Sequence, residues 1–181
     1  MLSFRIISGQ HKGRRLRAPK NLPVRPTTDR AKEALFNILT NQIDLTNSHL
    51  LDLYAGTGSI SYEFLSRGGQ TSTAVDKHRG CLAFINETAH HLKLPIQTIQ
   101  SDVTSFLEKN RQPFEFIFMD PPFSFTREQF ALNLDLILQS DWFASGLLVL
   151  EHPPEIEWND REQCIESRRY GGSHFSFFST K

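Results

Sequence analysis

Four consecutive residues, Asp120-Pro121-Pro122-Phe123, combine groups that could bind a planar amine. The carboxylate of Asp120 and the carbonyl oxygen of Pro121 accept hydrogen bonds, and a proline has no backbone N–H to compete for them. The ring of Phe123 offers a face on which a flat group can stack. The tetrapeptide therefore predicts a site for a planar molecule with an exocyclic amine. A proline-rich turn in which Asp120 caps a helix would explain the same residues.

The element that must position these groups is the segment just before them, residues 114–119. It is apolar apart from one glutamate, which is typical of a buried strand. In an open parallel sheet, ligands bind beyond the carboxyl ends of the strands. We therefore expect the tetrapeptide to lie at a strand end that faces a binding site.

A second candidate site is the segment Asp52-Leu53-Tyr54-Ala55-Gly56-Thr57-Gly58, a strand that runs into a Gly-x-Gly turn. Glycines in such a turn let the backbone approach a ligand closely. The third glycine of the dinucleotide-binding pattern is absent, because Gly58 is followed by Ser-Ile-Ser. We expect five residues of this turn to contact a cofactor: Asp52, Tyr54, Ala55, Gly56 and Gly58.

Acids occur at three successive predicted strands, at Asp52, Asp76 and Asp102. Clustered carboxylates disfavour a pyrophosphate and favour a cationic nucleoside. S-adenosylmethionine fits this pattern, with its sulfonium and amino group near Asp52, its ribose on Asp76 and its adenine near Asp102. Capping of strand ends would be the purely structural explanation of each acid.

The net charge of zero hides an asymmetry along the chain. Residues 1–32 contain nine lysines and arginines against one acid, so this segment carries +8 and the rest carries −8. One-signed charge of this kind favours a contact with nucleic acid, although basic residues also protect the exposed edge of a hairpin. The residues expected to bind RNA are Arg5, Lys12, Arg14, Arg15, Arg17, Arg25 and Arg30.

The pattern of apolar residues predicts a basic hairpin arm over 1–24 and a catalytic domain over 25–181. In the arm, strands over 4–8 and 14–18 flank a turn. Thr27 or Thr28 should cap a helix that buries Ala31, Ala34, Leu35, Ile38 and Leu39. Further strands are expected over 49–53, 71–76, 96–100, 114–119, 147–150, 163–169 and 174–179. Further helices are expected over 59–67, 79–92, 103–110 and 126–139.

This alternation of strands and helices predicts an α/β fold with a mainly parallel, seven-stranded sheet and helices on both faces. The last two strands should form a hairpin that places one antiparallel strand at the end. The chain of 181 residues is long enough for a substantial core. It has no membrane-spanning apolar run and no signal peptide, and its two cysteines, Cys81 and Cys164, favour a reducing, cytoplasmic setting. We expect no metal site, and the histidines do not look like ligands.

Taken together, these motifs resemble those of the RsmD family, the bacterial 16S ribosomal RNA (guanine-N2)-methyltransferases. The most specific parts lie in residues 5–16 and in 25–37, which begins Arg25-Pro26-Thr27-Thr28. The segment 52–58 and the tetrapeptide at 120–123 are shared with many amino-methyltransferases. Tyr54, Asp76 and Phe123 stand where the family usually has Phe, Glu and Tyr, and each keeps the chemical role. The C-terminal part matches only loosely, around Tyr170-Gly171.

The resemblance implies a Rossmann-like class I methyltransferase that uses S-adenosylmethionine. It also implies an extruded guanine of 16S rRNA, free or in an assembling 30S subunit, as the acceptor. Asp120, Pro121 and Phe123 would then be the catalytic residues, in a protein expected to be monomeric. The residues leave three alternatives open: a methyltransferase for small molecules or proteins, one for adenine N6, and a non-catalytic rRNA-binding assembly factor.

Overall fold

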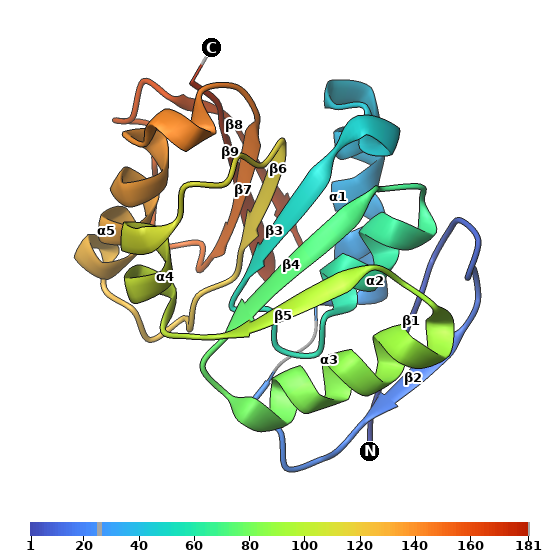
Figure 1. The fold of residues 1–181 in the computed structure, drawn as a ribbon. Coiled ribbons are helices and arrows are strands. Elements are labelled where there is room, and N and C mark those ends of the chain that lie inside the picture. Colours follow the sequence, from blue (N-terminus) through green and yellow to red (C-terminus); the bar gives the residue numbers. More distant parts are fainter. Residues whose placement is uncertain (25–26, 181) are drawn as a thin grey trace.

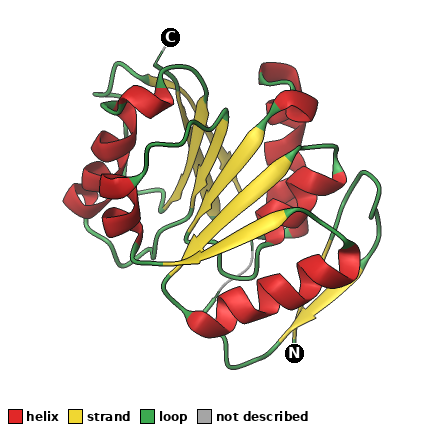
Figure 2. Ribbon diagram, viewed as in Figure 1, coloured by secondary structure: helices red, strands yellow, loops and turns green. Residues whose placement is uncertain are grey.

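The computed structural model describes residues 1–24 and 27–180 (Figure 1). It confirms an α/β fold with a seven-stranded sheet and a separate two-stranded hairpin (Figure 2). The strands are β1 (Leu2–Arg5), β2 (Arg15–Ala18), β3 (His49–Leu53), β4 (Thr71–Asp76), β5 (Ile96–Gln100), β6 (Phe116–Met119), β7 (Leu147–His152), β8 (Cys164–Tyr170) and β9 (Ser173–Phe178). The helices are α1 (Asp29–Gln42), α2 (Ser59–Ser66), α3 (Arg79–Leu92), α4 (Val103–Lys109) and α5 (Arg127–Leu138), with short 3-10 turns at Leu45–Asn47 and Asp141–Phe143.

The strand order in the large sheet is β5-β4-β3-β6-β7-β9-β8. Strands β3 to β7 are parallel, and β9 runs antiparallel to both β7 and β8. The predicted antiparallel strand is thus present, but it lies inside the sheet rather than at its edge. Successive strands are added on one side of β3 up to β5 and on its other side from β6 onward, and the strand ends open a crevice at this switch between β3 and β6, the usual ligand position in such sheets.

Helices cover both faces of the sheet, as the alternating pattern predicted (Figure 1). On one face, α4 and α5 pack over β6 and β7 in a core that includes Ile117, Met119 and Phe130. On the other face, α1 and α2 pack in a second core that includes Phe116 and Phe118. The two cores divide β6 by alternate residues, because successive side chains of a strand point to opposite faces. None of the helices among the described residues has the length and apolarity needed to cross a membrane.

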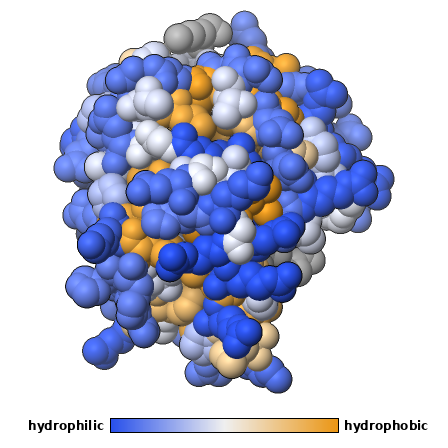
Figure 3. Space-filling view, turned by 90° about the vertical axis from the view of Figure 1, so that its right-hand side faces the viewer, coloured by the Kyte–Doolittle hydropathy of each residue, from blue (hydrophilic) through white to orange (hydrophobic). Residues whose placement is uncertain are grey.

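The N-terminal hairpin pairs β1 with β2, with Arg5 opposite Arg15 and Phe4 opposite Leu16. Its alternation separates two faces. Phe4, Ala18 and the half-buried Leu16 pack in a core with Tyr62 and Cys81, whereas Arg5, Arg15 and Arg17 are exposed. The hairpin is therefore docked on the domain by its apolar face and presents its arginines outward. Figure 3 shows the side of the molecule on the right of Figure 1, where hydrophobic surface appears only in patches among hydrophilic residues.

The predicted buried face of α1 needs correction. The buried stripe of α1 contains Ala31, Leu35 and Leu39 as expected, but Lys32 and Phe36 are buried where Ala34 and Ile38 were predicted. The buried face of α1 therefore differs from the predicted one, because the helix packs against the hairpin and α2 as well as the sheet.

The strand predicted over 114–119 begins only at Phe116. Just before it, the backbone carbonyl of Glu115 still accepts the N–H of Leu147 at 2.9 Å, and its carboxylate accepts the backbone N–H of His49 at 2.9 Å.

Candidate active site

A cavity of about 670 Å³ opens at the carboxyl ends of β3, β4, β6 and β7. Its wall brings together the two candidate sites that the sequence indicated, although they are more than sixty residues apart in the chain. The predicted residues that line it are Asp52, Tyr54, Ala55, Gly56, Asp76, Asp102, Asp120, Pro121 and Phe123. Gly58 is not part of the wall but begins α2 directly behind the turn.

The turn after β3 has three residues in the left-handed region: Tyr54 (φ 59°), Gly56 (φ 55°) and Gly58 (φ 75°). A side chain at Gly58 would meet Ile85 and Tyr62 at 3.0 and 3.1 Å, so the position needs glycine for space as well as for φ.

Tyr54 is not a glycine, and its backbone is held in this sparsely populated conformation by side-chain contacts. Its hydroxyl accepts a hydrogen bond from the Asn133 amide at 2.6 Å, and its ring packs edge-on against Phe125. Strain of this kind is typical of functional turns.

Asp52 is buried, with 2% of its surface exposed. The hydroxyl of Ser61 donates to its carboxylate at 2.5 Å, and Ser61 is also hydrogen-bonded to Ser72. Burial raises the pKa of Asp52 to about 7, an effect that the Ser61 hydrogen bond only partly offsets. A cation bound beside this carboxyl would favour its charged form.

Asp76 ends β4 and organises the backbone around the cavity. Its carboxylate accepts from the N–H of Gly56 at 2.9 Å and from that of His78 at 2.8 Å. Asp102 follows β5 and caps α4, accepting from Ser105 N–H at 3.1 Å. The capping explanation thus holds for Asp102, yet the same side chain lines the cavity. Both acids are fixed by backbone donors, which pre-organises this wall.

The corner at residues 120–123 follows β6 as predicted. The backbone N–H of Asp120 donates to the Leu53 carbonyl at 3.3 Å, which ties the corner to the turn after β3. Helix α5 is capped by Thr126 in a full capping box, so the interpretation of Asp120 as its cap is wrong. Pro121 is buried, and Asp120 and Phe123 are half-buried.

The sequence analysis missed several residues of the wall, among them Thr27, Glu151, Tyr170 and Ser173. Glu151 is 3% exposed and accepts hydrogen bonds from the hydroxyls of Ser173, at 2.7 Å, and Thr27, at 3.3 Å. The available signal was its position near the end of β7, the next parallel strand after β6. The C-terminal segment, for which no role was predicted, therefore contributes part of the cavity.

Most of the predicted RNA-binding residues lie on the hairpin, and Arg30 lines the cavity itself. Arg5, Lys12, Arg14, Arg15, Arg17 and Arg30 are all exposed, whereas Arg25 lies outside the described residues. A groove of about 300 Å³ between hairpin and α1 is lined by Arg5 and Arg15 and shares Thr27 and Thr28 with the main cavity. Like charges directly opposite each other destabilise a hairpin, and Arg5, which stands opposite Arg15, forms an ion pair of 3.2 Å with Asp29.

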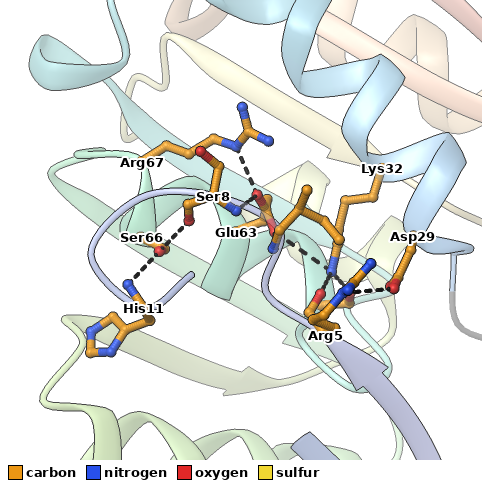
Figure 4. A network of polar contacts seen from close by, with 10 residues as sticks. Arg5, Ser8, His11, Asp29, Lys32, Glu63, Ser66 and Arg67 are labelled. Carbon is orange, nitrogen blue, oxygen red and sulfur yellow. Dashed lines mark hydrogen bonds and ion pairs between the residues drawn. The ribbon is translucent and has the colours of Figure 1, made fainter. Parts of the chain in front are cut away.

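A buried polar network fixes the hairpin to the domain (Figure 4). The carboxylate of Glu63 in α2 accepts from the N–H of Ile7 at 2.7 Å, from the N–H of Ser8 at 3.1 Å and from Arg67 at 2.7 Å. Lys32 lies 3.7 Å from Glu63, with both side chains fully buried. Burial lowers the pKa of Lys32, although the Glu63 charge opposes this.

The sheet order, the cavity at the strand ends and the acid closing β4 define the class of the protein: a class I, S-adenosylmethionine-dependent methyltransferase fold. Among solved structures, a putative methyltransferase from Escherichia coli, yhhF, superposes with a TM-score of 0.84 at 27% identity, over 98% of this chain and 97% of that one. A Thermus thermophilus 16S rRNA N2 G1207 methyltransferase, solved with AdoMet and guanosine, gives 0.76 at 18% identity, over 99% of this chain and 50% of that one.

The family model described as Conserved hypothetical protein 95 matches residues 4–179. The chain therefore belongs to this family, the RsmD family that its motifs indicated. It is 34% identical to Ribosomal RNA small subunit methyltransferase D of Escherichia coli K12, over 81% of this chain and 72% of that protein. It is also 34% identical to the Putative rRNA methyltransferase YlbH of Bacillus subtilis, over 85% of each chain.

Proposed function

We propose that this protein transfers a methyl group from S-adenosylmethionine to the exocyclic N2 of a guanine in the 16S rRNA of the small ribosomal subunit. The names of its relatives support methylation of ribosomal RNA. The observation that carries the proposal is the convergence of the Asp120–Phe123 corner with three acid-bearing strand ends on one cavity. The setting would be the cytoplasm, where ribosomal subunits assemble.

The cavity fits S-adenosylmethionine by size and by charge. A volume of about 670 Å³ lies within the range of small-molecule pockets. Asp52 would hold the cationic amino-acid part, Asp76 the ribose hydroxyls, and the region of Asp102 the adenine. The backbone of Gly56 can approach the cofactor closely because it has no side chain. When bound, S-adenosylmethionine supplies a methyl group on a positively charged sulfur.

The corner at 120–123 provides the groups that the acceptor base needs. The amine of a purine is a weak nucleophile because its lone pair is delocalised into the ring. Hydrogen bonds from its two N–H groups to the Asp120 carboxylate and the Pro121 carbonyl would hold the nitrogen partly pyramidal and aim its lone pair. Orientation of this kind contributes several kcal/mol, up to about 7–11 in the best intramolecular cases.

When the new N–C bond forms, the old C–S bond breaks and the amine must lose one proton. The Asp120 carboxylate would accept that proton, directly or through water. Phe123 would stack on the flipped base, and stacking of this kind is worth about 1–3 kcal/mol. The hairpin arginines would bind backbone phosphates, which gives affinity and position rather than sequence choice.

The test is transfer of labelled methyl to three substrates in parallel: undermethylated 30S particles, free 16S rRNA and DNA. Nucleoside analysis of the product should find N2-methylguanosine in rRNA. Finding N6-methyladenosine instead would refute the guanine-N2 assignment. Incorporation into none of the three, by an enzyme that binds S-adenosylmethionine, would refute the nucleic-acid assignment altogether.

A further inference from the structure

Glu151 lines the cavity but has no part in the methyl transfer described above. It is the second-to-last residue of β7, and 3% of its surface is exposed. A carboxylate so deeply buried at the edge of a site is costly unless it has hydrogen-bond donors. A substrate bound in the cavity would therefore meet this carboxylate.

The sheet register places Glu151 beside Asp120. Met119 of β6 pairs with Leu150 of β7 in parallel, so the residues that follow them are the next neighbours across strands about 4.8 Å apart. Two residues earlier, Phe118 and Val149 both belong to the core under α1. By the alternation of a strand, Asp120 and Glu151 extend toward that same face, where both line the cavity.

Two hydroxyls hold the Glu151 carboxylate in place. Ser173 donates to Oε1 at 2.7 Å and Thr27 donates to Oε2 at 3.3 Å. An ionised carboxylate can accept about four hydrogen bonds, and these two contacts fix the direction of both oxygens. Both donors come from parts of the chain that the methyl transfer leaves unexplained, the segment before α1 and the first residue of β9.

We propose that Glu151 recognises the N1–H of the target guanine and thereby excludes adenine; this inference rests on the proposed function. Guanine presents three N–H donors side by side, two on N2 and one on N1. The Asp120 carboxylate, the Pro121 carbonyl and the Glu151 carboxylate are three acceptors for them. In adenine, N1 beside the amine is itself an acceptor, so its lone pair would face the Glu151 charge. A mismatch of this kind is strongly rejected in a buried site.

The probe that isolates this contact is 2-aminopurine, which keeps the 2-amine but has an acceptor at N1. RNA fragments would carry guanine, 2-aminopurine or adenine at the position mapped in the rRNA experiment. The wild-type enzyme should prefer guanine over 2-aminopurine by on the order of 100-fold in kcat/KM. E151Q keeps the side-chain shape and can donate to an N1 acceptor. Its preference should fall below about 10-fold.

E155Q is the matched control, because Glu155 is exposed and lies on the same segment. It should keep the full preference. A merely structural Glu151 would lower activity on guanine and 2-aminopurine alike, so an unchanged ratio in E151Q overturns the inference. If E151Q does not fold, S173A, which loosens the carboxylate, must lower the same ratio or the inference is overturned.

The outcome also separates this inference from the proposed function. If the wild type makes no N2-methylguanine, the proposed function fails and this inference fails with it. If the wild type makes N2-methylguanine but treats guanine and 2-aminopurine alike, only the role of Glu151 is refuted.

Discussion

The ammonium group of Lys32 donates a hydrogen bond to the backbone carbonyl of Arg5 at 2.6 Å and so joins α1 to the basic hairpin. The same group donates to Ser59 at 3.0 Å and lies 3.7 Å from the Glu63 carboxylate. Glu63 in turn accepts the backbone N–H groups of Ile7 and Ser8. One buried ion pair therefore fixes where the arginines stand relative to the active site (Figure 4).

Replacing Lys32 with methionine should lower the free energy of unfolding by about 3 kcal/mol, because removal of one partner leaves a buried charge behind. The loss should lie at the lower end of the range for broken buried ion pairs, since Arg67 still pairs with Glu63 at 2.7 Å. Chemical denaturation measures the change, with K20M as the exposed control. RNA affinity should fall more than cofactor affinity. A K32M protein as stable as wild type would show that the network does not hold the arm.

Replacing Asp120 with alanine should reduce kcat by at least about 100-fold, since the variant loses the acceptor that orients the amine and takes its proton. Binding of S-adenosylmethionine, measured by calorimetry, should stay within about threefold of wild type. D120N keeps the size but not the charge and should also be impaired. The role fails if either variant turns over at the wild-type rate.

Neutralising the exposed face of the hairpin should weaken RNA binding in a salt-dependent way. For R15Q with R17Q, the slope of log K against log salt should become shallower by about 1.4–1.8, because each phosphate contact contributes about 0.7–0.9. K109Q with R111Q removes the same charge from exposed sites at the end of α4, which packs in a different core from the hairpin, and is the control. Identical slopes for all three proteins would exclude the hairpin from the RNA interface.

Much of this architecture could be predicted because it is encoded locally. Helix α3 and strand β5 begin and end where periodicity placed them. The acids at the strand ends were found because a parallel sheet gathers the carboxyl ends of its strands at one edge. The Asp120 corner was found because two prolines and an acid after an apolar run permit few structures.

What could not be predicted depends on contacts between distant segments. Lys32 and Glu63 have the charges of a solvated helix face, and only the hairpin lying across them makes burial possible. Glu151 likewise looks like the end of a strand until Thr27 and Ser173 meet over it, from 124 and 22 residues away. The left-handed Tyr54 has no local signal either, because its conformation is imposed by Asn133 and Phe125.

The last prediction concerns the pH dependence of cofactor binding. Burial raises the pKa of Asp52 to about 7, so the free protein holds this carboxyl partly protonated at neutral pH. A cationic cofactor group beside it would favour the carboxylate and lower its pKa on binding. Below pH 7 binding must therefore release a proton, and affinity should rise up to about tenfold per pH unit until pH 7, then level off.

Calorimetry between pH 5.5 and 8.5, in buffers of different ionisation enthalpy, measures both the affinity and the protons released. D52N keeps the size and the position beside Ser61 but cannot ionise, so it should bind more weakly at pH 8 and show no slope below pH 7. The exposed D141N serves as control and should follow the wild-type curve. A wild-type affinity that is constant across this range would mean that the cofactor does not draw on the charge of Asp52, because a carboxyl that titrates there cannot stabilise a cation equally at both ends.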